Sequence, residues 1–149
     1  MIDVNSDAFF MKEAIKEAQR AFDKGEVPVG VVVVADNKIV ARAHNLTQTL
    51  NDVTAHAEMQ AITSAANAIN GKYLTDCKMY ITLEPCVMCA GALSWSQIGE
   101  IIYGAADEKK GFSLVGCNLL HPKTKIKSSV LEKECAELLN HFFKKLRRK

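Results

Sequence analysis

Residues 29–35, VGVVVVA, are the stretch that decides the fold of this chain. The run is short, rich in β-branched valine and without a polar side chain, which predicts a strand covered on both faces rather than one that alternates between core and solvent. Asp36 and Asn37 favour a tight turn, and KIVARA at 38–43 is the expected hairpin partner. The stretch therefore predicts an α/β fold with a mixed sheet covered by helices.

Further elements are predicted on either side of this hairpin. Amphipathic or apolar patterns favour helices at about 7–24, 55–70, 85–96 and 130–148, and apolar runs favour strands at 79–83 and 100–104. Expected helix starts are Ser6 or Asp7, Thr54, Pro85, and the capping-box spacing from Ser129 to Glu132. Residues 105–128 are expected to be mostly loop.

Length and composition indicate a single domain spanning 1–149. The chain is 48% hydrophobic with only 3 Pro, which suits one compact core. No stretch approaches the roughly 20 apolar residues that a membrane span needs, and no export signal begins the chain. We therefore expect a cytoplasmic protein whose five cysteines are thiols or metal ligands rather than a disulfide framework.

Positive charge is concentrated at the C-terminus. Residues 121–149 hold 9 Lys and Arg against 3 Asp and Glu, whereas residues 1–120 hold 10 against 14. The basic end of the last predicted helix includes Lys144, Arg147 and Arg148, which suits contact with a polyanion such as RNA. Cations that only complement the helix dipole would give the same pattern.

Cys86 and Cys89 form a C-x-x-C pair at the start of a predicted helix. The positive end of the helix favours the thiolate, which is the form that binds metal or acts in disulfide exchange. The pair alone is compatible with half a metal site, a redox pair or buried core cysteines. His56 and Glu58, at the start of the preceding predicted helix, favour the metal site, because both side chains could converge on one ion there.

The combination matches a known signature. His-Ala-Glu at 56–58 and Pro-Cys-Val-Met-Cys at 85–89 fit the H-x-E…P-C-x-x-C pattern of zinc-dependent nucleobase and nucleoside deaminases. Over most of its length the chain resembles bacterial tRNA-specific adenosine deaminases of the cytidine/deoxycytidylate deaminase superfamily. The resemblance is carried by GEVPVG at 25–30, ARAHN at 41–45, TLEPCVMCAGAL at 82–93, YGAAD at 103–107 and ECAELLNHFFKKLR at 134–147.

This resemblance implies a fold and a reaction. The expected fold is a three-layer α/β/α, cytidine-deaminase-like arrangement with a central mixed sheet of about five strands. The expected enzyme is a homodimer with one Zn²⁺ per subunit, and its substrate is adenosine 34 in the anticodon stem-loop of tRNA. Hydrolysis at this wobble position would yield inosine and ammonia.

The resemblance also assigns roles to residues. His56, Cys86 and Cys89 would hold the zinc and leave its fourth position open to water, and Glu58 would move the protons. Substrate contacts are implied for Asn45, Pro28, Val29, Ala57 and Asp107, and RNA contacts are suggested for Lys109, Lys110, Lys144, Arg147 and Arg148.

Two alternatives stay open at the level of sequence. Residues 111–129 lack the small-residue run and the Asn-His pair that the family usually carries there, so a free guanine or cytosine base or nucleoside is the competing substrate. The second alternative is a non-catalytic zinc module that binds nucleic acid, with Cys77, Cys117 or His44 as a fourth ligand. Cys135 lies on the apolar stripe of the last predicted helix and is expected in the core.

Overall fold

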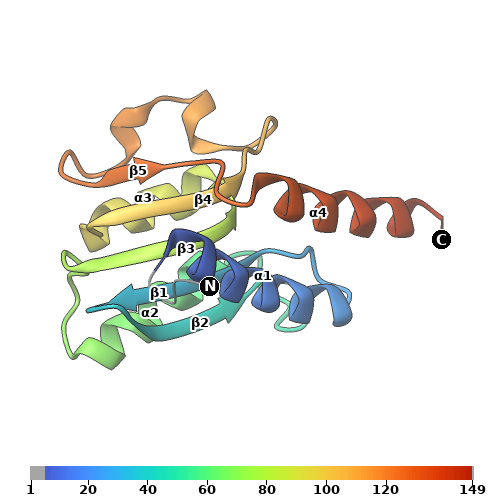
Figure 1. Ribbon diagram of the computed structural model, residues 1–149. Coiled ribbons are helices and arrows are strands. Elements are labelled where there is room, and N and C mark those ends of the chain that lie inside the picture. Colours follow the sequence, from blue (N-terminus) through green and yellow to red (C-terminus); the bar gives the residue numbers. More distant parts are fainter. Residues whose placement is uncertain (1–5, 149) are drawn as a thin grey trace.

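A five-stranded mixed sheet forms the centre of the computed structural model, which describes residues 6–148 (Figure 1). The strands are β1 (Gly30–Ala35), β2 (Lys38–His44), β3 (Cys77–Leu83), β4 (Glu100–Ala105) and β5 (Lys125–Lys127). Their order across the sheet is β2-β1-β3-β4-β5. β1 pairs antiparallel with β2 and with β3, whereas β4 pairs parallel with β3 and with β5.

Strand β1 is covered on both faces, as its composition predicts. Val31 and Val33 belong to one core cluster, and Val32 and Val34 belong to a second cluster on the opposite face. The turn to β2 places Asp36 and Asn37 at φ 52° and 59°. These left-handed conformations match the twist of a two-residue hairpin, and Asn and Asp tolerate them better than most residues do.

Helices cover the sheet in two layers (Figure 1). α1 (Asp7–Asp23) and α4 (Glu132–Arg147) pack with Tyr80 and Ile102 in the cluster that contains Val32. α2 (Ala57–Ile69) and α3 (Val87–Ser96) pack on the other face with Met79 and Ile101. The predicted three-layer α/β/α arrangement, with a mixed sheet of five strands, is confirmed.

Gly30 sets the distance between α1 and the start of β1. A Cβ atom added there would lie 2.0 Å from the Ala14 carbonyl oxygen and 2.3 Å from the Ala18 backbone nitrogen. The Gly30 N–H donates to Thr82 Oγ1 on β3 at 3.1 Å, which holds the strand in this position. Helix and strand backbones therefore touch directly, and no larger residue fits between them.

Helices α2 and α3 begin two residues later than the sequence predicts. His56, not Thr54, is the residue before α2, and the helix ends at Asn70 in a left-handed conformation with φ 58°. Thr54 instead donates its hydroxyl to Asp52 in a local turn. α3 begins at Val87, after Cys86, so that Pro85 lies outside the helix. Both corrections move a predicted metal ligand to the residue that precedes a helix.

The segment 105–128 contains more structure than the predicted loop. Two 3₁₀ turns, Phe112–Leu114 and Cys117–Leu119, precede β5, which supplies the fifth strand. β5 is only three residues long and exposed along its length, so it carries no hydrophobic pattern that sequence reasoning detects. Its place is set by pairing with β4 and by the ion pair of Lys127 with Asp7 at 2.6 Å.

The predicted capping box at Ser129 is wrong. α4 begins at Glu132 after Leu131, which has φ 53° and makes no capping hydrogen bond through its side chain. Cys135 is buried as expected, together with Leu139 and Phe142, whereas Phe143 is 40% exposed. In the described part of the chain, no helix is both long enough and apolar enough to cross a membrane.

Replacing Gly30 with Ala is expected to destabilise the fold. The added methyl group collides with backbone atoms of α1, which cannot rotate away, so we expect Gly30→Ala to lower the free energy of unfolding by about 3 kcal/mol. Urea denaturation measures the loss. Gly71→Ala is the matched control, because nothing lies within 4 Å of an added Cβ there. Equal stability of the two variants would contradict the proposed contact.

Candidate metal centre and active-site cleft

His56, Cys86 and Cys89 come together where the N-termini of α2 and α3 meet. His56 Nδ1 lies 3.7 Å from Cys86 Sγ and 3.5 Å from Cys89 Sγ. The ligand atoms of all three residues lie within 4.8 Å of one another, and no other such group of three or more His, Cys, Asp and Glu side chains occurs among the described residues. One nitrogen and two sulfurs at this spacing can hold a metal ion.

The electrostatics of the cluster favour a ligating thiolate. The hydrogen bond with Cys89 and, next, the one with His56 hold the pKa of the Cys86 thiol at about 4. Cys89 is fully buried, and its bond to Cys86 together with burial raises its own thiol pKa. The contact with Cys86 also raises the pKa of His56. The three groups are therefore held together by hydrogen-bonded protons. A bound metal cation would take the place of these protons, since metal binding releases protons from its ligands.

Glu58 lies beside this cluster in the first turn of α2. Its side chain is only 4% exposed, and burial raises the pKa of its carboxyl group to about 7. A carboxyl group with this pKa both accepts and releases a proton at neutral pH. The position is therefore suited to a general acid and base rather than to a surface ion pair.

An open cleft of about 860 Å³ lies over His56, Glu58 and Cys86. The predicted site residues that line it are His56, Glu58, Cys86, Asn45, Val29, Ala57, Asp107, Lys109, Lys110 and Arg147. The described residues in its wall that sequence reasoning missed are Val27, Thr47, Leu83, Glu84, Ala106, Glu108, Leu139, Asn140 and Phe143. The cleft thus gathers residues from six separate regions of the chain.

Several expected residues lie elsewhere. Pro28 is buried and does not line the cleft, where Val27 takes its place. Lys144 and Arg148 are exposed on α4 beyond the cleft. Cys77 and His44 are outside the metal-ligand group, and the side chain of Cys117 is not among those described. Cys135 is buried in the core, as predicted.

Asn45 follows β2 directly and faces the cleft. Its side-chain amide donates to the Val27 carbonyl oxygen at 3.4 Å, and its Oδ1 accepts from the Thr47 N–H at 3.3 Å. Its backbone N–H donates to the Val29 carbonyl at 3.1 Å. These contacts hold a polar side chain, only 7% exposed, in the wall of the cleft beside Val27 and Val29.

Two buried glutamates anchor the loops on either side of the cleft. Glu26 accepts hydrogen bonds from the backbone N–H groups of Gln48 and Thr49 at 3.0 and 2.6 Å. Burial opposes the ionisation of Glu26, but these bonds bring its pKa below the usual value. Glu84 accepts in the same way from Asp107 and Ser113 at 3.1 and 3.0 Å. The only sequence signal for Glu84 is an acidic residue inside an apolar stretch.

Comparison with known proteins agrees with this geometry. The family model of the MafB19-like deaminases matches residues 4–147. The chain is 47% identical to a tRNA-specific adenosine deaminase of Aquifex aeolicus over 93% of this chain and 95% of the relative. It is 45% identical to a tRNA-specific adenosine deaminase of Bacillus subtilis over 98% of this chain and 94% of the relative.

A solved structure shares the fold and much of the sequence. It comes from a study of A-to-I editing by tRNA:A34 deaminases at the wobble position of transfer RNA, and it superposes with a TM-score of 0.81 at 40% identity. The match covers 87% of this chain and 98% of that chain. Since the family model and both relatives extend over nearly the whole chain, the protein belongs to the MafB19-like deaminases and, among them, to the family of tRNA-specific adenosine deaminases.

Proposed function

We propose that this chain is a single deaminase domain that acts in the cytoplasm. We propose that it hydrolyses adenosine 34 in the anticodon loop of tRNA to inosine and ammonia. The observation that carries the proposal is the buried Glu58 beside the His56, Cys86 and Cys89 cluster in an open cleft. A structural metal site would need no unligated carboxyl group at this place. The relatives that act on tRNA adenosine match the chain over nearly its whole length.

We propose Zn²⁺ as the metal, held by His56, Cys86 and Cys89. One imidazole and two sulfurs, one of them on a thiol that ionises well below neutral pH, form a donor set that zinc prefers over magnesium or calcium. When bound, zinc with three protein ligands lowers the pKa of a water in its open position and so supplies a nucleophile at neutral pH.

Glu58 carries the protons of the reaction. Its carboxylate accepts a proton from the attacking water and donates it to the ring nitrogen beside the reacting carbon. The second proton of the water then passes through the same carboxyl group to the departing amino group, which leaves as ammonia. A pKa of about 7 suits both transfers, since neither protonation state is costly at neutral pH.

The walls of the cleft suit a flipped purine. Val29 and Ala57 supply apolar surface against the base, while Asn45 supplies an amide that can hydrogen-bond to its edge. Apolar side chains and a hydrogen-bonding amide thus line the same cleft as the His56, Glu58 and Cys86 side chains. We assign base recognition to Asn45 and proton transfer to Glu58.

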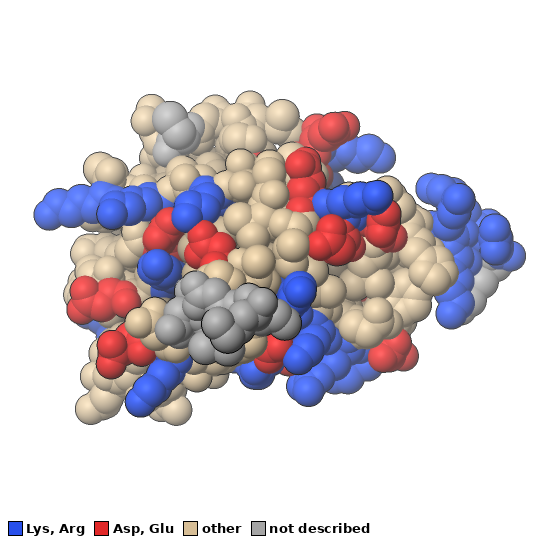
Figure 2. Space-filling model, viewed as in Figure 1, with Lys and Arg blue, Asp and Glu red and all other residues tan. Residues whose placement is uncertain are grey.

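The mouth of the cleft suits the RNA around the base. Asp107, Lys109, Lys110 and Arg147 lie at its rim, and Lys144 and Arg148 extend the positive charge along α4. Figure 2 shows blue basic side chains gathered at the right-hand end of the molecule, where α4 ends. Phosphates of an anticodon stem would meet this surface while the loop enters the cleft.

We also propose a homodimer that uses the outer face of α3. Val87 and Trp95 lie two helical turns apart on one face, and Trp95 is 86% exposed. Leu114 and Val115 flank Val87 around a shallow hollow next to the cleft. So much exposed apolar surface on one side is typical of a protein interface.

The substrate assignment is tested with four substrates offered separately: an anticodon stem-loop with adenosine 34, free adenosine, guanine and cytosine. We expect inosine in the stem-loop and no turnover of the free compounds, because the rim contacts need RNA. Mass spectrometry of the products and an ammonia assay follow the reaction. If guanine is deaminated and the stem-loop is not, the tRNA assignment is contradicted. The site would then be that of a deaminase acting on free bases.

Replacing Glu58 with Gln is expected to separate catalysis from metal binding. The amide keeps the shape of the side chain but cannot shuttle protons, so we expect kcat to fall about 1,000-fold or more. Metal content, measured by atomic emission, should stay at one zinc per chain, because Glu58 is not a ligand. Cys89→Ser is the contrasting variant, and it should lose both zinc and activity. A Glu58→Gln enzyme with near-normal kcat would overturn the role of this residue.

The dimer is tested by sedimentation. We expect the wild type to sediment at twice the 16.4 kDa of one chain, and Trp95→Glu to shift toward the monomer, because a charge replaces apolar surface in the proposed interface. Tyr73→Glu is a control at another exposed aromatic residue, 48% exposed and outside α3. A monomeric wild type, or a Trp95→Glu variant that remains dimeric, would argue against this face.

A further inference from the structure

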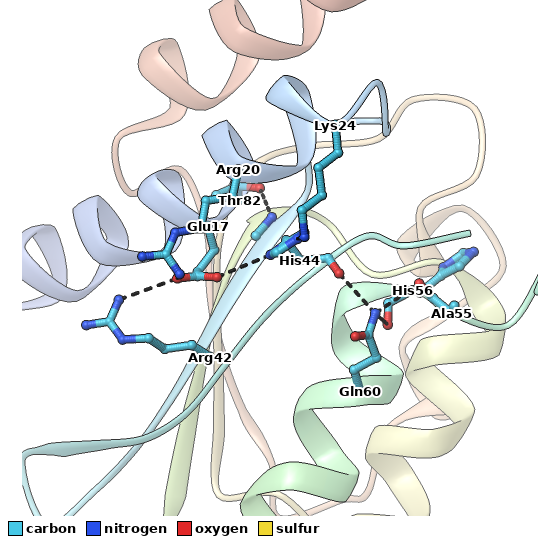
Figure 3. Close-up of polar contacts among 10 residues, drawn as sticks. Glu17, Arg20, Lys24, Arg42, His44, Ala55, His56, Gln60 and Thr82 are labelled. Atoms are coloured by element: carbon cyan, nitrogen blue, oxygen red, sulfur yellow. Dashed lines mark hydrogen bonds and ion pairs between the residues drawn. The ribbon is translucent and has the colours of Figure 1, made fainter. Parts of the chain in front are cut away.

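The side chain of Gln60 binds three backbone carbonyl groups behind the metal cluster (Figure 3). Gln60 lies one turn into α2, and its Nε2 is 2.9 Å from the His44 carbonyl oxygen and 3.1 Å from the Ala55 carbonyl oxygen. A longer contact of 3.4 Å reaches the carbonyl of His56. One amide thus joins the end of β2 to the two residues that precede α2.

The two segments that Gln60 joins both carry residues that line the cleft. His44 is followed by Asn45 in one wall, and Ala55 is followed by His56 in the metal cluster. A single backbone hydrogen bond, from the Leu46 N–H to the Ala55 carbonyl at 3.0 Å, runs beside the Gln60 contacts. The loop between these segments, residues 47–54, has no regular secondary structure. Few hydrogen bonds therefore join the two segments that carry Asn45 and His56, and Gln60 supplies two or three of them.

The carbonyl of His44 is a firm point of attachment. Lys24 Nζ donates to His44 Nε2 at 2.9 Å, which leaves Nδ1–H of the ring to donate to Glu17 Oε1 at 3.3 Å. Both partners belong to α1 or to the residue that ends it, on the opposite face of the sheet from α2. Figure 3 shows the contacts continuing from Glu17 through His44 to Gln60.

A glutamine on a helix surface usually extends into water, where its amide keeps its hydrogen bonds with water molecules. The amide of Gln60 instead turns inward, with two N–H groups facing three carbonyl oxygens, and its side chain is half-buried. Burial of an amide costs free energy unless it is hydrogen-bonded, so this arrangement persists because the contacts compensate for it.

We propose that Gln60 is a positioning residue, which sets the distance between the base-recognition residue Asn45 and the metal ligand His56 through their neighbouring carbonyl groups. The inference rests on the proposed deamination of a base held between these two residues. Gln60 touches neither the substrate nor the metal, so its effect reaches the reaction only through the backbone. Indirect contacts of this kind typically alter metal affinity or activity by about 10-fold to 100-fold when removed.

Two substitutions test the role of the amide. Gln60→Met removes the polar group with little change in length, and Gln60→Glu keeps the shape but replaces the donor nitrogen with oxygen. Gln19→Met is the matched control, because Gln19 is an exposed helix glutamine whose amide donates to the Asp23 side chain at 3.0 Å. Three properties are measured at a temperature where all variants are folded. They are hydrogen exchange of the Leu46 amide, the rate of zinc release to a chelator, and kcat and KM on the stem-loop.

We expect both Gln60 variants to exchange the Leu46 amide and to release zinc about 10-fold faster than the wild type. We also expect kcat to fall about 10-fold with KM changed by less than about 2-fold, because the phosphate contacts at the rim are distant from Gln60. Gln19→Met should match the wild type in every measurement. The proposal would be overturned if Gln60→Met matched the wild type in amide exchange, zinc release and kcat and differed only by a lower melting temperature.

The two levels of inference fail separately. If the wild type does not deaminate the stem-loop, the proposed substrate is wrong, and amide exchange and zinc release still decide whether Gln60 holds the two segments together. If the wild type is active and Gln60→Glu retains its kcat and zinc, the amide donors have no positioning role.

Discussion

The N-termini of α2 and α3 meet with His56 and Cys86 as the residues before each helix, and the functional site depends on this contact. Residues at this position have extended backbone conformations, so their side chains project past the helix ends instead of lying along them. Both helix ends also direct unpaired N–H groups and a partial positive charge toward the cluster. The same geometry therefore brings His56, Cys86 and Cys89 together and favours the ionised thiol of Cys86.

The sheet and its two helix layers hold the N-terminal ends of α2 and α3 in place. Gly30 allows α1 to contact the start of β1 directly, and β1 in turn aligns β2 and β3 on either side. β2 leads into Asn45, whereas β3 leads into Cys86. A shift of one strand would separate the wall of the cleft from its metal cluster, because each strand delivers one of them.

Around the sheet and its helices, buried or half-buried polar side chains organise the irregular segments. Glu26 and Glu84 each bind backbone N–H groups of a loop, while Gln60 binds backbone carbonyl groups. A buried polar group must be hydrogen-bonded, so such residues restrict a loop more tightly than surface contacts do. None of these three belongs to the metal signature, yet each borders a segment that contributes residues to the cleft.

The sequence by itself determined the buried strand within 29–35, the hairpin, the helix patterns and the candidate ligands His56, Cys86 and Cys89, because all of these depend on local periodicity or on short, chemically specific motifs. Tertiary structure decided where α2, α3 and α4 begin and where the exposed strand β5 lies. Hydrogen bonds and packing with residues distant in the sequence override the local preference for a capping residue. The role of Gln60 belongs to the same class. A glutamine four residues after His56 looks like an ordinary helix-surface residue until folding brings the carbonyl of His44, sixteen residues away, within 2.9 Å of its amide.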